Sequence, residues 1–169
     1  MLTKLSKKSS DIGGFTLIDN VFAVGIIALG FSALYAMSSQ CLKLDYAARE
    51  EMTASQGLQD RGDSLRQCTW AQITDPTYLS ANIMNKAANK APLMNKMAET
   101  VTINAYPTPA ATPIQLTRSS AGVVTIVSQN SAIANGDMVK IDVQMAWTSW
   151  SGNRSHTETL STIFAENPR

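Results

Sequence analysis

The stretch GGFTLIDNVFAVGIIALG, residues Gly13 to Gly30, decides the fold of this chain because an apolar run opens directly behind two glycines. The run continues to Met37 and is longer than the ~20 residues that a helix needs to cross the hydrocarbon core of a bilayer. Its one charged side chain is Asp19, close to its start. The run therefore predicts a single membrane span with an acid where an ordinary anchor avoids one.

The leader that precedes the run is short and basic. Residues 1–14 carry Lys4, Lys7 and Lys8 against a single acid, Asp11. Lysine and arginine beside an apolar segment tend to stay on the cytoplasmic side of the membrane. We therefore expect the amino terminus to face the cytosol.

Two interpretations of the leader and the run compete. In the first they form a secretory signal peptide, cut at the small-residue site Ala36-Met37-Ser38, so that the mature chain begins near Ser39. In the second the leader is cut after Gly14 and the apolar run stays in the mature protein. The second interpretation explains the two glycines and the position of the acid, because glycine has no side chain to obstruct a peptidase and discourages a continuous helix.

The motif GFTLID, from Gly14 to Asp19, resembles the cleavage and methylation site of type IV prepilins and pseudopilins. In that family a glycine is usually followed by Phe-Thr-Leu-Ile-Glu, so Asp19 is the one departure. The resemblance implies that a prepilin peptidase removes residues 1–14. It also implies that the new amino terminus, Phe15, is N-methylated.

Asp19 then has two possible cationic partners and one local alternative. Cleavage creates an α-amino group at Phe15, which is largely protonated at neutral pH. Positions i and i+4 are neighbours on a helix, so the carboxylate can meet the amine of its own chain. The resemblance implies instead a contact with the amine of an adjacent filament subunit. The alternative is that Asp19 only caps the start of a helix.

One nearly continuous helix is predicted from about Phe15 to Arg66, since the first proline of the chain is Pro76. Its second half is amphipathic, and Gly57 and Gly62 allow a bend there. Residues at three- and four-residue steps form the expected core stripe: Leu44, Ala48, Met52, Ser55, Leu58, Gly62 and Leu65.

The two cysteines of the chain, Cys41 and Cys68, both lie on or beside this helix. On a straight helix they are ~40 Å apart at ~1.5 Å per residue. A disulfide needs Cα atoms within ~7 Å of each other. We therefore expect no intrachain disulfide.

The carboxy-terminal half changes to the two-residue period of strands. Val139–Trp147 alternates apolar and polar residues. The Asn135-Gly136 pair before it predicts a hairpin with Val123–Ser128. After a turn at Ser151-Gly152-Asn153, a further strand is expected at His156–Ala165.

Weaker strand candidates lie at Val101–Tyr106 and Ile114–Arg118, and a short helix is possible at Tyr78–Lys90. Together the strands predict an antiparallel sheet of four or five strands that packs against Leu44–Leu65. The stretch VQMAWTSWSGNRSHTETLSTIFA, which ends at Ala165, resembles the terminal hairpin of minor pilins and pseudopilins.

Composition argues against several classes of function. The net charge is +1, which does not suit a nucleic-acid-binding protein with its dense basic face. One histidine and two cysteines are too few for a typical metal centre, and no phosphate loop or paired-carboxylate site is present in the sequence. His156 is interpreted as a lone surface histidine. We expect no enzyme activity, catalytic residue, metal or cofactor.

The prediction is an α+β, pilin-like chain with four parts: a removed leader (1–14), a transmembrane and filament-core helix (15–38), an amphipathic helix half (39–68), and a connector with an antiparallel globular domain (69–169). The resemblance implies a minor pilin or pseudopilin. Its implied partners are the prepilin peptidase, other pilin or pseudopilin subunits and the inner-membrane assembly platform.

The resemblance also implies a location. The chain is expected in the bacterial inner membrane as a single-pass protein, and after assembly in a pilus, the periplasm or the cell exterior. The alternatives are a membrane-anchored binding or adhesion module that never polymerises, and a secreted soluble domain.

Overall fold

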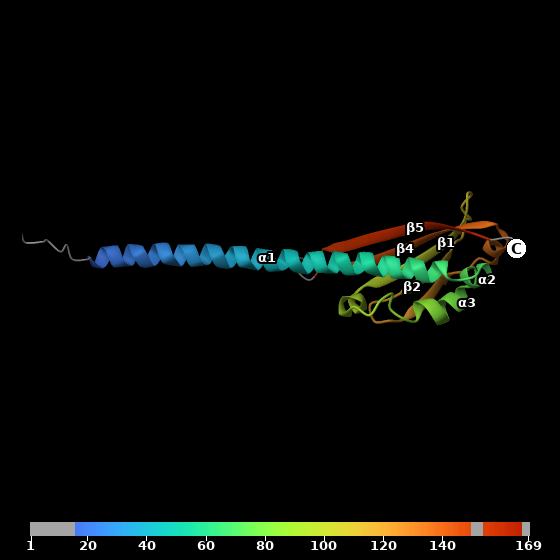
Figure 1. Ribbon diagram of the computed structural model, residues 1–169, viewed down its shortest axis with the longest axis horizontal. Coiled ribbons are helices and arrows are strands. Elements are labelled where there is room, and N and C mark those ends of the chain that lie inside the picture. The colour runs from blue at the N-terminus through green and yellow to red at the C-terminus, as the bar shows by residue number, and fades with distance from the viewer. Residues whose placement is uncertain (1–15, 150–153, 167–169) are drawn as a thin grey trace, which may run out of the picture. The chain divides into compact units, whose positions relative to one another are not determined.

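The computed structural model describes residues 16–149 and 154–166 (Figure 1). The chain divides into two compact units, Met1–Leu42 and Lys43–Arg169, and each is described by itself. Helix α1 (Leu17–Arg66) contributes its first part to the first unit and its second part to the second. The helix predicted from about Phe15 to Arg66 is thus confirmed.

The second unit is built on a five-stranded sheet in the order β3-β2-β1-β4-β5, with every pair antiparallel. The α+β class, with a long amino-terminal helix and an antiparallel sheet, is confirmed. The strand bounds are β1 (Ala98–Ala105), β2 (Ile114–Arg118), β3 (Val124–Ser128), β4 (Met138–Thr148) and β5 (Ser155–Ala165).

The hairpin predicted between Val123–Ser128 and Val139–Trp147 is wrong. β3 pairs with β2, whereas β4 pairs with β1 and β5. A 3₁₀ turn, η3 (Ser131–Asn135), separates β3 from β4. The Asn130 side chain accepts a hydrogen bond from the Ala132 backbone at its start, and Gly136 ends it, so Asn135-Gly136 closes a helical turn and not a hairpin.

The hairpin of β4 and β5 is confirmed, and its register runs from Met138 opposite Ala165 to Thr148 opposite Ser155. Its predicted turn at Ser151-Gly152-Asn153 lies outside the described residues. β4 alternates between buried and more exposed residues, as its sequence predicts. The sheet therefore has one inward face and one face toward solvent, the usual state of an antiparallel sheet.

The connector between α1 and β1 forms short helical turns: α2 (Trp70–Ile73), α3 (Pro76–Tyr78), the π-helical η1 (Leu79–Met84) and the 3₁₀ η2 (Pro92–Lys96). The helix predicted at Tyr78–Lys90 is thus shorter and ends at Met84. A physical reason is at hand, because the Arg61 guanidinium donates to the carbonyl oxygens of Ile83 and Lys86. In a continuing helix those carbonyl oxygens would accept hydrogen bonds from backbone N–H groups, whereas here they accept from the Arg61 side chain.

The predicted core stripe of the helix is correct only in its second half. Leu44, Ala48, Met52 and Ser55 are exposed. The buried face contains polar residues and begins later along α1; it consists of Glu50, Thr53, Ala54, Gly57, Leu58, Arg61, Gly62 and Leu65. A search for apolar residues alone misplaces this face because two of its members are charged.

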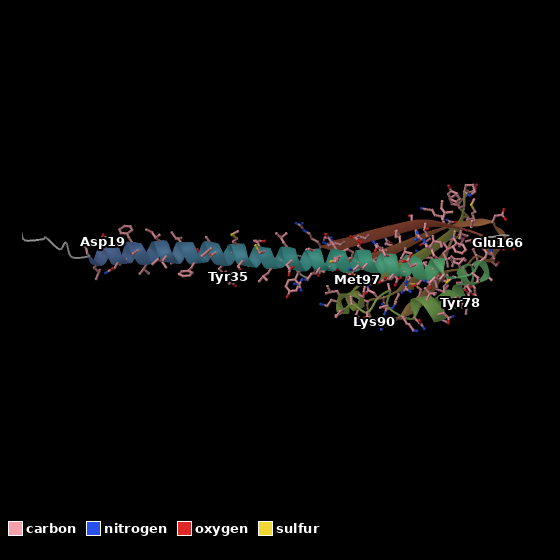
Figure 2. The ribbon with its side chains drawn as sticks, in the orientation of Figure 1. Asp19, Tyr35, Tyr78, Lys90, Met97 and Glu166 are labelled. Carbon is pink, nitrogen blue, oxygen red and sulfur yellow. The ribbon has the colours of Figure 1, made fainter. Side chains whose placement is uncertain are left out.

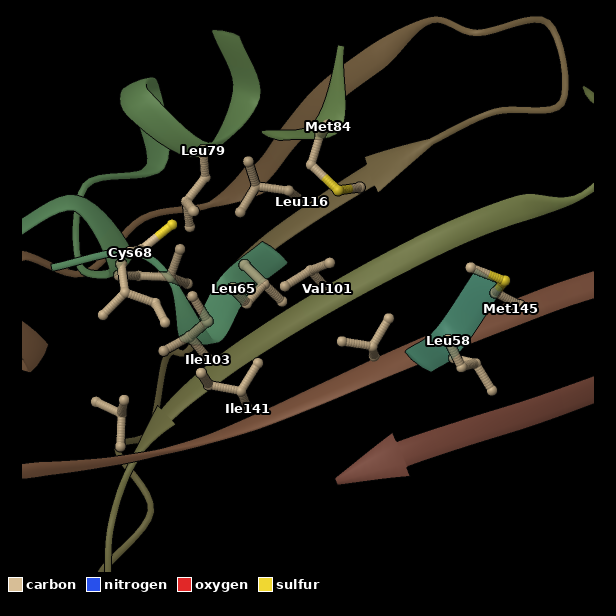
Figure 3. Packing of buried hydrophobic residues seen from close by; sticks show 14 of the residues in the cluster. Leu58, Leu65, Cys68, Leu79, Met84, Val101, Ile103, Leu116, Ile141 and Met145 are labelled. Atoms are coloured by element: carbon tan, nitrogen blue, oxygen red, sulfur yellow. The ribbon is translucent and has the colours of Figure 1, made fainter. Parts of the chain in front are cut away.

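The inward faces of the sheet and the buried face of α1 share one apolar core (Figure 3). Leu58 and Leu65 supply the helix side, and Val101, Ile103 and Ile141 are among the strand residues that meet it. The connector closes the core with Leu79 and other buried apolar residues. The connector is therefore an integral part of this unit.

Gly57 and Gly62 are the points where α1 comes close to the rest of its unit. A Cβ atom on Gly57 would lie 2.8 Å from Met94 Sδ and 2.9 Å from Met145 Cε, and one on Gly62 would lie 2.8 Å from Leu160 Cδ2. α1 continues as one helix through both positions. The two glycines thus serve close packing, and the bend that they permit is not needed.

Gly57→Leu is expected to destabilise the folded chain. Overpacking a filled core costs about 1–3 kcal/mol, more than the ~1 kcal/mol that replacing a helical glycine returns. Urea unfolding of the full chain in neutral detergent, followed by tryptophan fluorescence, measures the difference. Ser55→Leu, at an exposed position of the same helix, is the matched control and should change the free energy of unfolding by less than about 0.5 kcal/mol. Equal stability of the two variants would contradict the close approach at Gly57.

Candidate assembly site

The first unit presents a continuous apolar surface. Figure 2 shows the side chains along α1, with Asp19 and Tyr35 labelled. The large apolar residues here are all more than half exposed: Leu17, Ile18, Val21, Phe22, Val24, Ile26, Ile27, Leu29, Phe31, Leu34, Tyr35 and Met37. Apolar patches of this extent on a protein surface mark a membrane or a protein interface. By length and composition α1 is able to cross a membrane.

Asp19 forms a capping box with Thr16 at the start of α1. Asp19 Oδ2 accepts from the Thr16 backbone nitrogen at 3.1 Å and from Thr16 Oγ1 at 2.7 Å. The Asp19 backbone nitrogen donates to Thr16 Oγ1 at 3.3 Å. Such reciprocal bonds satisfy backbone donors that the first turn of a helix leaves open. The local alternative for Asp19 is therefore present in the structure.

The cap does not exclude an additional partner for the acid. The two hydrogen bonds that Thr16 donates, from its backbone nitrogen and its hydroxyl, both end on Oδ2, and Asp19 lies on the exposed first turn. The predicted cleavage and methylation residues, Gly14 and Phe15, lie outside the described residues. Whether Asp19 meets an amine stays a prediction.

Cys41 and Cys68 are both free thiols, Cys41 exposed and Cys68 buried. Cys68 Sγ donates to the Ser64 carbonyl oxygen at 3.5 Å, and burial raises the pKa of its thiol. Thiolate is the nucleophilic form, so a buried thiol with a raised pKa reacts slowly. Cys68 is accordingly a core residue and not a reactive one.

Cys68 is expected to react with iodoacetamide at least about tenfold more slowly in the folded chain than in the urea-unfolded chain, because its sulfur is buried and burial raises the pKa of its thiol. Mass spectrometry of tryptic peptides at pH 8 measures both rates, with Cys41 as the exposed control. Because the unfolded thiol loses its proton first, the stability contributed by Cys68 should fall as the pH rises above ~8.5. Fast labelling of Cys68 in the folded chain would contradict its burial.

His156 stacks on Trp147, with ring centroids 5.4 Å apart and an interplanar angle of 16°. The two residues are opposite each other on β5 and β4. His156 is half-buried, so the surface position predicted for it is only partly correct. Within residues 16–149 and 154–166 no group of three or more histidine, cysteine or acidic side chains is placed to hold a metal ion.

A buried ion pair ties α1 to the sheet and to the connector. The side chains of Arg61 and Glu99 are 4% and 2% exposed. Arg61 Nη2 donates to Glu99 Oε2 at 2.9 Å, and Arg61 Nε donates to Glu99 Oε1. The same guanidinium donates to the carbonyl oxygens of Ile83 and Lys86, the latter at 2.8 Å. One side chain of α1 thus fixes β1, the end of η1 and the turn that follows η1.

This ion pair was not predicted from the sequence, although the sequence contains a signal for it. Arg61 lies four residues after Gly57 and four before Leu65, on the buried face of the helix. Glu99 shares a two-residue period with Val101, on the inward face of β1. A charge of each sign on two inward-facing patterns predicts a buried pair, because neither is stable there alone.

Comparison of the chain with known protein families, curated proteins and solved structures gives no match. A long amino-terminal apolar helix whose second part packs on an antiparallel sheet is compatible with a pilin-like, membrane-anchored protein.

Proposed function

We propose that this chain is a minor pilin or pseudopilin, a non-catalytic subunit of a type IV pilus-like filament or of the related secretion apparatus. Before assembly, the first part of α1 anchors it in the inner membrane. After removal of residues 1–14, the same helix leaves the bilayer and packs against the helices of other subunits.

The observation that carries the proposal is the uncovered apolar surface of Leu17–Met37. No residue that the structure describes buries this surface, since its large apolar side chains are all more than half exposed. Lipid can cover it before assembly and neighbouring apolar helices can cover it afterwards, because both offer apolar contact. A permanent anchor requires only the first of these states.

Asp19, near the start of the helix, distinguishes a subunit that assembles from a permanent membrane anchor. Thr16 and Asp19 both remain after a cut at Gly14, so the capping box is retained in the proposed mature chain. Asp19 Oδ1 accepts no hydrogen bond from any residue that the structure describes. One carboxylate can therefore cap its own helix through Oδ2 and accept from a protonated amine through Oδ1.

The proposal is tested by co-purification with filaments. The full chain, tagged at its carboxy terminus, is expressed in a host with a prepilin peptidase and a pilus or secretion apparatus, and filaments are sheared and sedimented. The chain is expected in the sheared fraction, and only in the membrane when the peptidase is deleted. Retention in the membrane in both hosts would favour a non-polymerising anchored module and would contradict assembly. Recovery as a soluble protein that starts near Ser39 would contradict the proposal as a whole.

A further inference from the structure

A hollow of about 520 Å³ opens where the connector meets the end of β2. It is lined by residues 86–91, Asn95 and Arg118. Three of the lining side chains are cationic, namely Lys86, Lys90 and Arg118, and none is acidic. This volume falls within the range of small-molecule sites, and a cluster of cations without an acid attracts anions.

Arg118 is the buried member of this cluster. It is 8% exposed and lies on the inward face of β2, opposite Glu99 of β1. Its Nε atom has no hydrogen-bond partner among the residues that the structure describes. A buried cation whose charge is not offset by a paired carboxylate is costly, so Arg118 favours an anion that the protein alone does not supply.

Glu99 does not fill this role. Both of its carboxylate oxygens accept from the Arg61 guanidinium. Arg61, Glu99 and Arg118 together therefore carry one positive charge in excess, and Lys86 and Lys90 add to it at the rim. Figure 2 shows Lys90 on the connector, and both lysines are exposed, so their ammonium groups are free to turn toward a ligand.

We propose that this hollow binds a phosphate-class oxyanion, with Arg118 as the anchor and Lys86 and Lys90 as closing charges. A guanidinium presents a planar fork to phosphate oxygens, and its charge is delocalised over all three nitrogens. An anion held by the terminal nitrogens of Arg118 therefore offsets the positive charge of the whole guanidinium. A phosphomonoester carries close to two negative charges at neutral pH, which suits several cations better than one carboxylate does. The site is independent of the proposed assembly role.

The test is isothermal titration calorimetry on the full chain in neutral detergent micelles, at constant ionic strength set with sodium chloride. Inorganic phosphate and glycerol 3-phosphate are the two probes. Saturable binding is expected for the wild type, and about tenfold or more weaker binding for the Lys86→Gln/Lys90→Gln double variant. Both lysines are exposed, so the variant is expected to fold. Lys140→Gln, which removes a lysine paired with Asp142 on β4 outside the hollow, is the control and should bind as the wild type does.

The two probes separate the sources of the oxyanion. Lysine-dependent binding of both supports a site for the bare phosphate group. Lysine-dependent binding of glycerol 3-phosphate alone supports a site that also contacts an organic portion, as a headgroup or phosphorylated sugar would supply. An Arg118→Gln variant that keeps the wild-type circular dichroism spectrum should also lose binding. Absence of saturable binding to the wild type, or equal affinity of the wild type and the double-lysine variant, would overturn the proposal.

Discussion

Arg61→Ala is expected to lower the free energy of unfolding by about 3–5 kcal/mol, the usual cost of breaking a buried ion pair from one side. The variant leaves the Glu99 carboxylate buried without its cation, and it removes the donors to the carbonyl oxygens of Ile83 and Lys86. Typical domains have only 5–15 kcal/mol of stability in total. Urea unfolding of the full chain in neutral detergent, followed by tryptophan fluorescence, to which buried Trp147 contributes, measures the loss.

Two further variants isolate the cause of this loss. Arg66 pairs with Asp63 on the exposed side of the same helix, at 3.5 Å, so Arg66→Ala should cost no more than about 1 kcal/mol. In Arg61→Met/Glu99→Met both buried charges are gone, and part of the lost stability should return. If Arg61→Ala proved no more harmful than Arg66→Ala, the pair would not hold α1 to the sheet and connector.

Asp19→Ala is expected to reduce incorporation into sheared filaments by about tenfold or more, while the chain still inserts in the membrane. The physical reason is the loss of a charge-assisted bond to a protonated amine, and a tenfold change corresponds to ~1.4 kcal/mol. Membrane insertion depends on the length of the apolar run, which the substitution leaves intact. Immunoblots of the sheared and membrane fractions measure both quantities.

A Thr16→Ala variant separates this role from helix capping. It removes the hydroxyl of the capping box and keeps the carboxylate. If Asp19 pairs with an amine, Thr16→Ala should assemble nearly as the wild type does, and Asp19→Glu should retain assembly. Equal losses in Thr16→Ala and Asp19→Ala would show that the acid acts through the cap alone.

The elements with a clear period were predictable from the sequence. The apolar run and the absence of proline before Pro76 predict α1, and the alternation of Val139–Trp147 predicts β4. The pairing of β4 with β5 was predicted correctly, but its other partner was mistaken, because Asn135-Gly136 is a strong hairpin signal, while the preference of Asn130 for capping a short turn is a weaker one. Strand order depends on long-range pairing, which no local pattern encodes.

The buried face of the helix was predicted in part, since Leu58 and Leu65 follow the apolar period. The predicted stripe does not include Arg61 and Glu50, because charged residues are seldom buried. The close approach at Gly57 depends on Met94 and Met145, which are distant in sequence, so no local pattern reveals it. At the candidate assembly site the sequence did identify Asp19, and its cap by Thr16 is a local feature that the spacing of the two residues also encodes.

The central claim is that the apolar run remains in the mature protein behind a cut at Gly14. Intact-mass spectrometry with amino-terminal sequencing, on the full chain purified from a host with a prepilin peptidase, tests it most directly. We predict a chain that begins at Phe15 and carries one added methyl group, and an uncut leader when the peptidase is deleted. A mature chain that begins near Ser39, or one that keeps its leader in the presence of the peptidase, would contradict the account.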